Sequence, residues 1–167
     1  MRKVVGPHVA RIGAAVEASP GDPIDVASVA TVLVTSEAPA HPVELLFDGA
    51  GGPGGTRWEA GDDGDQTIVV EFDVPRSVSA VLVEIAETRR ARVQELELAV
   101  STDRGASFRS LLRQEFVFSP PSTCFERELW RLDGGPITHL KLWIRPDKSG
   151  TPLRATATTL ALFASGS

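Results

Sequence analysis

Short runs in which every second residue is apolar dominate this chain after its first third. In one run Ile68, Val70 and Phe72 share a face, and a second run begins at Val81 and repeats the pattern. A period of two places alternate side chains on opposite faces of an extended backbone, so each run predicts a half-buried β-strand. No segment after residue 48 keeps a convincing helical period. The pattern therefore favours a fold built almost entirely from strands.

About eight such runs lie along the chain, each bounded by residues that favour turns. Gly, Pro, Asp and Ser separate the runs, and residues 102–106 are typical of a hairpin turn. Regular short strands of this kind predict an all-β fold, a β-sandwich jelly roll of about eight antiparallel strands. The expected strands are residues 29–36, 66–73, 79–87, 92–101, 107–118, 123–132, 138–145 and 155–164.

The first part of the chain lacks these short alternating runs. Residues 1–28 are mixed in composition, and one stretch, 9–18, fits either a weak helix or a strand. A Ser-Pro-Gly-Asp-Pro sequence then ends this stretch as a turn. We therefore expect an N-terminal leader at 1–28, which adds a strand, packs over a sheet or stays mobile, and a single β-sandwich domain at 29–167.

Two other features lie between the first and second expected strands. Residues 42–47 predict one turn of helix, with Pro42 at the first helical position, where a missing N–H costs nothing. Residues 50–55 are rich in glycine and indicate a flexible loop. This loop is not a phosphate-binding loop, because no Gly-Lys-Ser/Thr follows it and no helix begins there.

Composition and charge exclude several classes of protein. The chain has 167 residues, which suits one domain, and its net charge of -5 argues against a general nucleic-acid binder. Cys124 is the only cysteine, so the chain forms no internal disulfide and no Cys-based zinc site. No run of about 18 apolar residues predicts a membrane span. The first residues also lack the apolar segment of a secretory signal, so we expect a cytoplasmic protein.

The middle of the chain carries an ordered set of motifs. His41-Pro-Val-Glu-Leu-Leu-Phe-Asp-Gly comes first, then Thr56-Arg-Trp-Glu-Ala, then Gln66-Thr-Ile-Val-Val-Glu-Phe. This order of helical turn, Asp-Gly, loop, Thr-x-Trp and alternating strand resembles the discoidin, or coagulation factor 5/8 type C, domains. The strand that begins at Arg92 and the turn after it resemble a strand-plus-turn segment of that family. The segments that begin at Arg113 and Thr138 resemble bacterial, mostly uncharacterised members of the same fold. The resemblance covers about residues 29–164 and implies a galactose-binding-like jelly roll.

The resemblance also implies a calcium ion that pins the glycine-rich loop. Members of the family often ligate calcium with the Asp of Asp-Gly and the Thr of Thr-x-Trp, which here are Asp48 and Thr56. The family usually adds a Glu from the last strand, where this chain has Thr159 or neutral neighbours, and fewer carboxylates weaken a calcium site. The alternative is an Asp48 that caps the turn through its own side chain. The sequence thus requires no cofactor and leaves structural calcium as one of two alternatives.

Basic residues crowd the loops at one end of the expected sandwich, where ligands commonly bind in such folds. Arg89, Arg90 and Arg92 share one turn, and we expect His41 and Arg57 to converge with them. Guanidinium groups form bidentate bonds to carboxylates, phosphates and sugar hydroxyls. In the alternative interpretation the turn is solvated and its arginines pair with nearby carboxylates. The candidate carboxylates are Glu84, Glu87 and Glu95.

The tryptophans divide between core and surface. The resemblance implies that Trp58 packs in the core. Trp143 lies on the strand face opposite Leu142, so we expect it to be exposed, and an exposed indole can stack on the C–H face of a sugar ring. Trp130 shares a face with acidic residues and is a second candidate for such stacking. Either ring can equally cover a sheet edge or a leader segment.

A charged pair on one strand predicts an ion-pair ladder. Arg113 and Glu115 are two residues apart and share a strand face. Side chains on one face of a sheet pair across neighbouring strands. We expect the pair to contact Glu126, Arg127 or Glu128 on the next strand along the chain.

The sequence argues against catalysis and for binding. His8, His41 and His139 are far apart, no Gly-x-Ser-x-Gly motif is present, and Cys124 has no activating neighbour. We therefore expect a non-catalytic module that recognises a carbohydrate or similar polar ligand through loops at one end of the sandwich. The alternative is an intracellular scaffold of the same fold that docks a protein partner. Neither function involves nucleic acid or membrane, and an outward tryptophan with open sheet edges permits a dimer.

Overall fold

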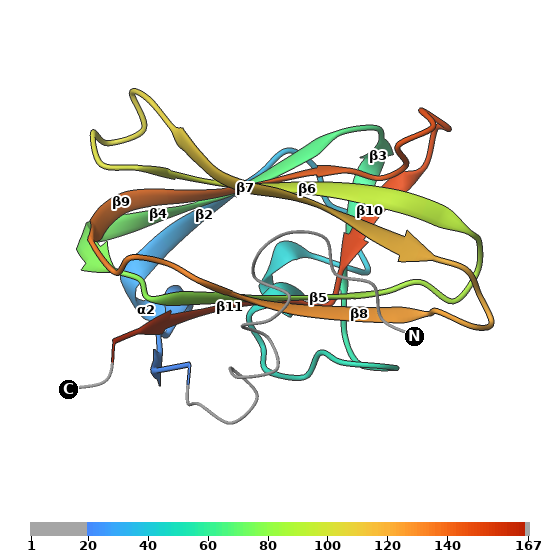
Figure 1. Cartoon of the computed structure of the whole chain (residues 1–167), viewed down its shortest axis with the longest axis horizontal. Helices are drawn as coiled ribbons and strands as arrows, with labels where there is room; N and C mark the ends of the chain where they lie inside the picture. Colours follow the sequence, from blue (N-terminus) through green and yellow to red (C-terminus); the bar gives the residue numbers. More distant parts are fainter. Residues whose placement is uncertain (1–19, 166–167) are drawn as a thin grey trace.

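The computed structural model describes residues 20–165, which form a β-sandwich (Figure 1). All strand pairs are antiparallel. The helices are α2 (Val26–Val29) and η1 (Val43–Leu46), a single 3-10 turn. The strands are β1 (Asp22–Pro23), β2 (Ala30–Val34), β3 (Trp58–Asp63), β4 (Gln66–Ser77), β5 (Ala80–Ala86), β6 (Arg92–Ser101), β7 (Arg109–Phe118), β8 (Phe125–Arg131), β9 (Pro136–Arg145), β10 (Arg154–Ala157) and β11 (Thr159–Ala164).

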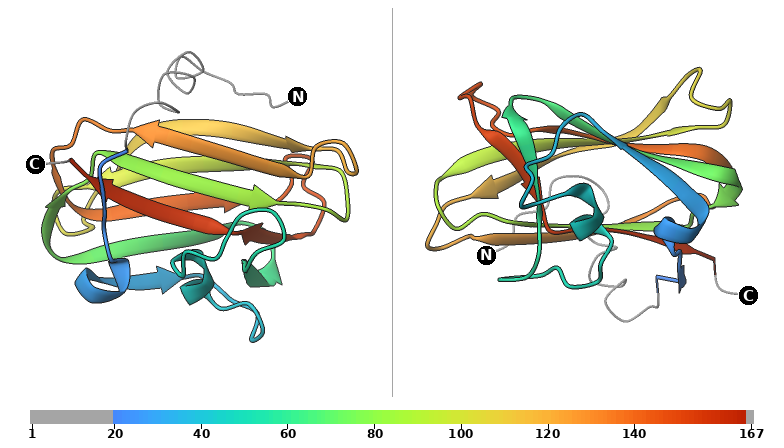
Figure 2. Two further views of the ribbon diagram at one scale, coloured as in Figure 1. Left: turned by 90° about the horizontal axis from the view of Figure 1, so that it is seen from below. Right: turned by 180° about the vertical axis from the view of Figure 1, so that it is seen from behind.

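Two sheets make the layers of the sandwich. The five-stranded sheet has the order β2-β4-β9-β6-β7, and the four-stranded sheet has the order β1-β11-β5-β8. The five-stranded sheet is the upper layer in Figure 1, and the view from below in Figure 2 shows β8, β5 and β11 side by side. Strands β3 and β10 form a separate two-stranded sheet at one side of the layers. The predicted all-β sandwich is confirmed.

The hydrophobic core fills the space between the layers. Ile68, Val70 and Phe72 of β4 are at most 1% exposed, and the alternate residues of β5, β6 and β9 are buried in the same way. The alternation read from the sequence therefore gives the correct inward face of each of these strands. Trp58 is fully buried, as expected for a packing residue, and its indole N–H donates to the carbonyl of Ser36 (3.2 Å).

Residues 20–165 contain eleven strands rather than about eight. The expected strand 155–164 is two strands, because the chain leaves the β10–β3 pair at Thr158 and joins β5 as β11. The N–H of Thr158 donates to the carbonyl of Glu84, which fixes this change of partner (2.8 Å). Strand β3 was not expected, since Trp-Glu-Ala-Gly-Asp-Asp has no β-branched residue and two residue types that strands disfavour. Pairing with β10 and burial of its alternate residues override that local preference.

The segment before β2 is part of the sandwich where the structure describes it. Asp22 pairs with Ala164 at the edge of the four-stranded sheet, and Val26 of α2 lies in the core with 4% exposure. The helix or strand expected at 9–18 lies outside the described residues. Among residues 20–165, no helix has the length and apolar character needed to cross a bilayer.

The helical turn expected at 42–47 exists, with one difference. Pro42 is the N-cap residue in an extended conformation, and the helix begins at Val43. The Val43 N–H, which has no partner inside the helix, donates to the carboxylate of Glu37 (2.7 Å). A side chain six residues away thus caps the turn, and sequence spacing alone did not indicate it.

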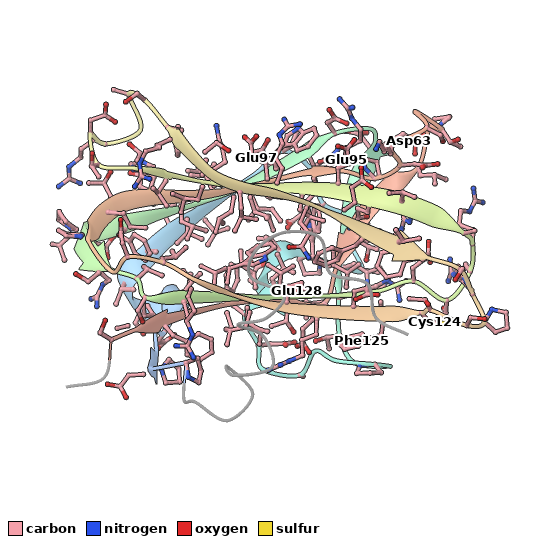
Figure 3. The ribbon with its side chains drawn as sticks, in the orientation of Figure 1. Asp63, Glu95, Glu97, Cys124, Phe125 and Glu128 are labelled. Carbon is pink, nitrogen blue, oxygen red and sulfur yellow. The ribbon has the colours of Figure 1, made fainter. Side chains whose placement is uncertain are left out.

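The ion-pair ladder expected for Arg113 was assigned to the wrong neighbours. Strands β7 and β8 follow each other in the chain but belong to opposite sheets, so β7 pairs with β6. Arg113 contacts Glu97, its register partner on β6, with 2.6 Å between Nε and Oε2, and Glu115 pairs with Lys148. Glu126 and Glu128 are buried, and Figure 3 shows Glu128 near the interior of the sandwich.

Candidate functional site

A cleft of about 560 Å³ opens at the end of the sandwich where β5 passes into β6. Four segments line it: the end of the glycine-rich loop, strand β3, the turn between β5 and β6, and the chain around β10. In Figure 1 this is the right-hand end of the molecule. Loops and strand ends from different parts of the chain therefore meet at one site.

Arginines dominate the lining of the cleft. Arg57, Arg89, Arg90 and Arg92, which we expected to converge, all line it, and Arg154 joins them from β10. The carboxylates of the lining are Glu59, Asp63 and Glu87. Arg154 carried no signal in the sequence, because its position depends on β10 pairing with β3.

Arg92 is bound tightly to the protein at the base of the cleft. Its Nε lies 2.9 Å from a carboxylate oxygen of Glu87, and both side chains are less than 10% exposed. One terminal nitrogen also donates to the carbonyls of Arg154 (2.8 Å) and Pro146 (3.4 Å). Burial lowers the pKa of Arg92 and the charge of Glu87 opposes that shift, yet guanidinium stays protonated in proteins. Arg92 thus joins β6, β10 and the turn, and it pairs with Glu87 as the alternative interpretation predicts.

The other arginines of the cleft are less constrained. Arg57 lies 3.3 Å from Glu59 and is partly exposed. Arg89, Arg90 and Arg154 are exposed, and their guanidinium groups form no ion pair with the residues between 20 and 165. The Arg89 backbone N–H donates to Glu87, which orders the turn without using its side chain (3.3 Å). These three guanidinium groups are therefore available to a ligand.

The lining of the cleft also includes a buried threonine. Thr158 lines the cleft and is 2% exposed, but its Oγ1 has no hydrogen-bond partner within the described residues. Its neighbour in the lining, Thr156, instead donates to the carbonyl of Trp58 (3.0 Å). A buried hydroxyl without a partner is unfavourable, so Thr158 is a polar group that a ligand or water would satisfy.

Asp48 and Thr56 close the glycine-rich loop on itself. One oxygen of Asp48 accepts the N–H of Ala50 (2.8 Å), and the other accepts the hydroxyl of Thr56 (2.7 Å). Gly51 lies against the start of β11, where a Cβ would stand 2.0 Å from Oγ1 of Thr159. The loop is therefore held by a capping aspartate and by close contact with a strand.

The loop uses both oxygens of the one carboxylate that the family resemblance assigned to calcium. Calcium takes six to eight oxygens, and both carboxylate oxygens of Asp48 already accept hydrogen bonds inside the loop. No cluster of three or more His, Cys, Asp or Glu side chains suited to a metal occurs in the part of the chain that the structure describes. Thr159, a neutral residue, is the side chain nearest to Gly51. The loop residues fit the alternative in which Asp48 caps the turn.

Comparison with solved structures identifies the fold. A family 32 carbohydrate-binding module from Clostridium perfringens, in complex with GalNAc-β-1,3-galactose, is 20% identical over 86% of this chain and 100% of that chain, with a TM-score of 0.60. The family 32 module of NanJ from the same organism, in complex with galactose, is 16% identical over 84% and 97% of the two chains, with a TM-score of 0.60. The family 32 module of AlyQ, in complex with 4,5-unsaturated mannuronic acid, is 15% identical over 81% and 95%, with a TM-score of 0.57.

The chain shares the antiparallel β-sandwich fold of these modules. No protein-family model and no curated protein sequence matches the chain. At these identities the likeness extends to the fold, and the ligand must be argued from the residues of this chain.

Trp143 lies on the outer face of the sandwich, away from the cleft. The guanidinium carbons of Arg113 and Arg145 are 5.0 and 5.3 Å from its ring centroid, and the ring is half-buried rather than open. Figure 3 shows Glu95 and Glu97 on the same outer side of the upper sheet. Two guanidinium groups therefore already contact the ring on which a sugar was expected to stack.

The remaining sequence candidates lie outside the cleft lining. His41 pairs through its backbone, donating to the Ala38 carbonyl and accepting the Glu59 N–H, and it supports β3 rather than lining the cleft. Trp130 is 1% exposed and its indole N–H donates to Gln114 across the sandwich, so it is a core residue and not a stacking platform (3.1 Å). The structure thus brings the four arginines together and separates them from His41 and Trp143.

Proposed function

We propose that this chain is a non-catalytic carbohydrate-binding module and that it holds its sugar in the arginine-lined cleft. The observation that carries the proposal is the convergence of guanidinium and carboxylate groups from four separate segments around one opening. The volume of about 560 Å³ lies within the range of small-molecule sites. The solved modules of the same fold bind galactose-containing sugars and a uronic acid, which supports a carbohydrate as the ligand.

The first contacts of the sugar are with Arg57 and Glu59. These residues are two positions apart and present a donor and an acceptor 3.3 Å from each other at the wall of the cleft. Neighbouring hydroxyls of a sugar ring need such a pair, because one hydroxyl accepts from a guanidinium while the next donates to a carboxylate. We infer that Asp63 and Thr158, which also line the cleft, add further polar contacts.

Binding without catalysis follows from how the carboxylates are used. Glycoside hydrolysis needs two carboxylates that are free to act as acid and base or nucleophile. Here Glu87 is paired with the buried Arg92 and Glu59 with Arg57. We propose that these carboxylates orient arginines and sugar hydroxyls rather than transfer protons.

We also propose that the module is of the discoidin type. Asp48, Gly49 and the Thr56-Arg-Trp58 sequence occur in the order of that family. Asp48 and Thr56 hydrogen-bond to each other across the loop, and Trp58 lies in the core. The module departs from the family pattern at the calcium position. We propose that the Asp48 hydrogen bonds take the place of the ion.

A protein-docking scaffold is the weaker alternative. A protein-docking surface is expected to expose an apolar patch, here around Trp143. The surroundings of Trp143 are instead charged, with Arg113, Arg145 and Glu97 beside it. The polarity of this outer face therefore supports the cleft as the binding site.

The test is calorimetric titration of the full chain with a panel of sugars, with and without a calcium chelator. We expect saturable binding that Glu59→Gln weakens and that the chelator leaves unchanged. Trp143→Ala is the matched control and should bind as the wild type does. Loss of binding in Trp143→Ala with normal binding in Glu59→Gln would move the site to the outer face.

A further inference from the structure

We infer that the sugar recognised by the cleft is acidic, carrying a carboxylate or a sulfate, and that Arg89, Arg90 and Arg154 hold this group. The inference rests on the proposed function, because it specifies the class of sugar that the same cleft takes.

The cleft is positive although the chain is acidic. Five arginines line it against three carboxylates, whereas the whole chain has a net charge of -5. Arg92 is neutralised by Glu87, and Arg57 is next to Glu59. The excess positive charge therefore belongs to the exposed residues of the rim. Concentrating like charges at one opening is unfavourable without a counter-charge, and an acidic ligand supplies one.

The lining contains no aromatic residue to stack on the C–H face of a sugar. Its apolar side chains are Ala86, Pro152 and Leu153, and the tryptophans of the described chain lie in the core or on the outer face. Binding energy must then come from hydrogen bonds. Hydrogen bonds between guanidinium and an anionic oxygen are about twice as strong as neutral ones, so an acidic group compensates for the absent stacking.

The unpaired arginines approach the opening from two walls. Arg89 and Arg90 lie in the turn after β5, and Arg154 begins β10 on the chain segment that Arg92 anchors. Asp63 is the register partner of Arg154, yet no ion pair joins them in the described residues. A planar carboxylate or a sulfate offers several oxygens, so it can bind guanidinium groups from both walls at once.

Two pairs of saccharides test the inference, and each pair has an acidic member and a neutral member with the same sugar backbone. One pair is oligogalacturonate and the same oligosaccharide with its carboxyl groups methyl-esterified, and the other is dextran sulfate and dextran. Each is titrated into the full chain by calorimetry at low and at raised salt. The variants are Arg90→Gln and Arg154→Gln. The matched control is Arg109→Gln, an exposed arginine at the opposite end of the sandwich.

We expect at least one acidic member to bind roughly tenfold or more tightly than its neutral partner, and each cleft variant to weaken that binding by roughly tenfold. Raised salt should reduce the difference, because exposed charges are screened. The Arg109→Gln control should bind as the wild type does. Preference for oligogalacturonate identifies a carboxylate as the acidic group, and preference for dextran sulfate identifies a sulfate.

Other outcomes separate this inference from the proposed function. Equal binding of the charged and neutral members, with loss in Glu59→Gln, would overturn the acidic sugar and leave the carbohydrate-binding function in place. Failure of these polysaccharides and of the wider sugar panel to bind would overturn both. Equally tight binding of a single-stranded DNA of matched charge, lost in Arg154→Gln, would overturn the sugar as the recognised feature.

Discussion

Glu87 and Arg92 form a buried ion pair at the base of the cleft, with 2.9 Å between Nε of the arginine and a carboxylate oxygen. The pair connects the turn after β5 with the first residue of β6. Its second function is to hold the carbonyl of Arg154, so it also fixes the wall that carries an exposed arginine. The buried pair therefore supports the position of an exposed arginine. Substitutions in the pair test the stability of the fold, and substitutions of the exposed arginines test ligand binding.

Replacing Arg92 should destabilise the fold. Arg92→Met leaves the Glu87 carboxylate buried without its partner, and breaking a buried pair costs about 3–5 kcal/mol of unfolding free energy. Urea unfolding followed by tryptophan fluorescence measures the change. Arg127→Met is the control, since the Arg127–Glu84 pair is exposed on the arginine side and worth less than about 1 kcal/mol. Similar losses in both variants would contradict the structural role of the Arg92 pair.

The glycine-rich loop should depend on Asp48 and not on calcium. Asp48→Ala removes the two hydrogen bonds that close the loop, which we expect to cost about 1–2 kcal/mol. Thr56→Val added to Asp48→Ala should cost little more, because both act through the same contact. Thermal unfolding with and without a chelator completes the experiment. A fall in Tm on chelation of the wild type would show that an ion, rather than the hydrogen bonds, holds the loop.

Gly51 should not accept a side chain. An added Cβ would stand 2.0 Å from Oγ1 of Thr159 and 2.7 Å from the carbonyl oxygen of Thr158. Gly51→Ala therefore forces the loop away from β11, at an expected cost of about 1–3 kcal/mol. Gly135→Ala is the control, because a Cβ there meets only an Asp133 oxygen at 3.5 Å. Equal unfolding free energies for the two variants would mean that the loop does not pack on the strand as described.

Asp103 should titrate at unusually low pH. Hydrogen bonds from Ser107 and then Ser101 lower the pKa of this carboxyl from 3.8 to about 2. A pKa lower in the folded than in the unfolded chain stabilises the fold above pH 3.8, and that stabilisation is lost as pH falls toward 2. NMR titration measures the pKa directly. Ser107→Ala should raise it toward the ordinary value, while Ser149→Ala, in another loop, should leave it unchanged.

Alternation was enough to predict which face of most strands is buried. Ile68, Val70 and Phe72 lie inward because a strand between two sheets must place alternate side chains in the core. The partner of each strand was not predictable in this way. Arg113 was assigned to β8, the next strand in the chain, but sandwich connections often cross between layers, and its real partner Glu97 lies on β6.

The sequence predicted those residues of the candidate site that lie close together in the chain. Arg89, Arg90 and Arg92 were found because they share one turn, and Arg57 because the family resemblance placed it beside that end. Arg154 could not be found, since it reaches the cleft only through the pairing of β10 with β3, a strand whose composition does not favour extension. Sites built from several segments depend on such long-range pairing.

The pairing of Asp22 with Ala164 has a practical consequence for handling the protein. The two residues are strand neighbours at the edge of the four-stranded sheet, and β11 runs from the cleft region at Thr159 toward this pair. In Figure 1 this edge is at the left of the molecule, away from β3 and β10. A surface linker attached beside Ala164 would orient every immobilised copy with its cleft outward.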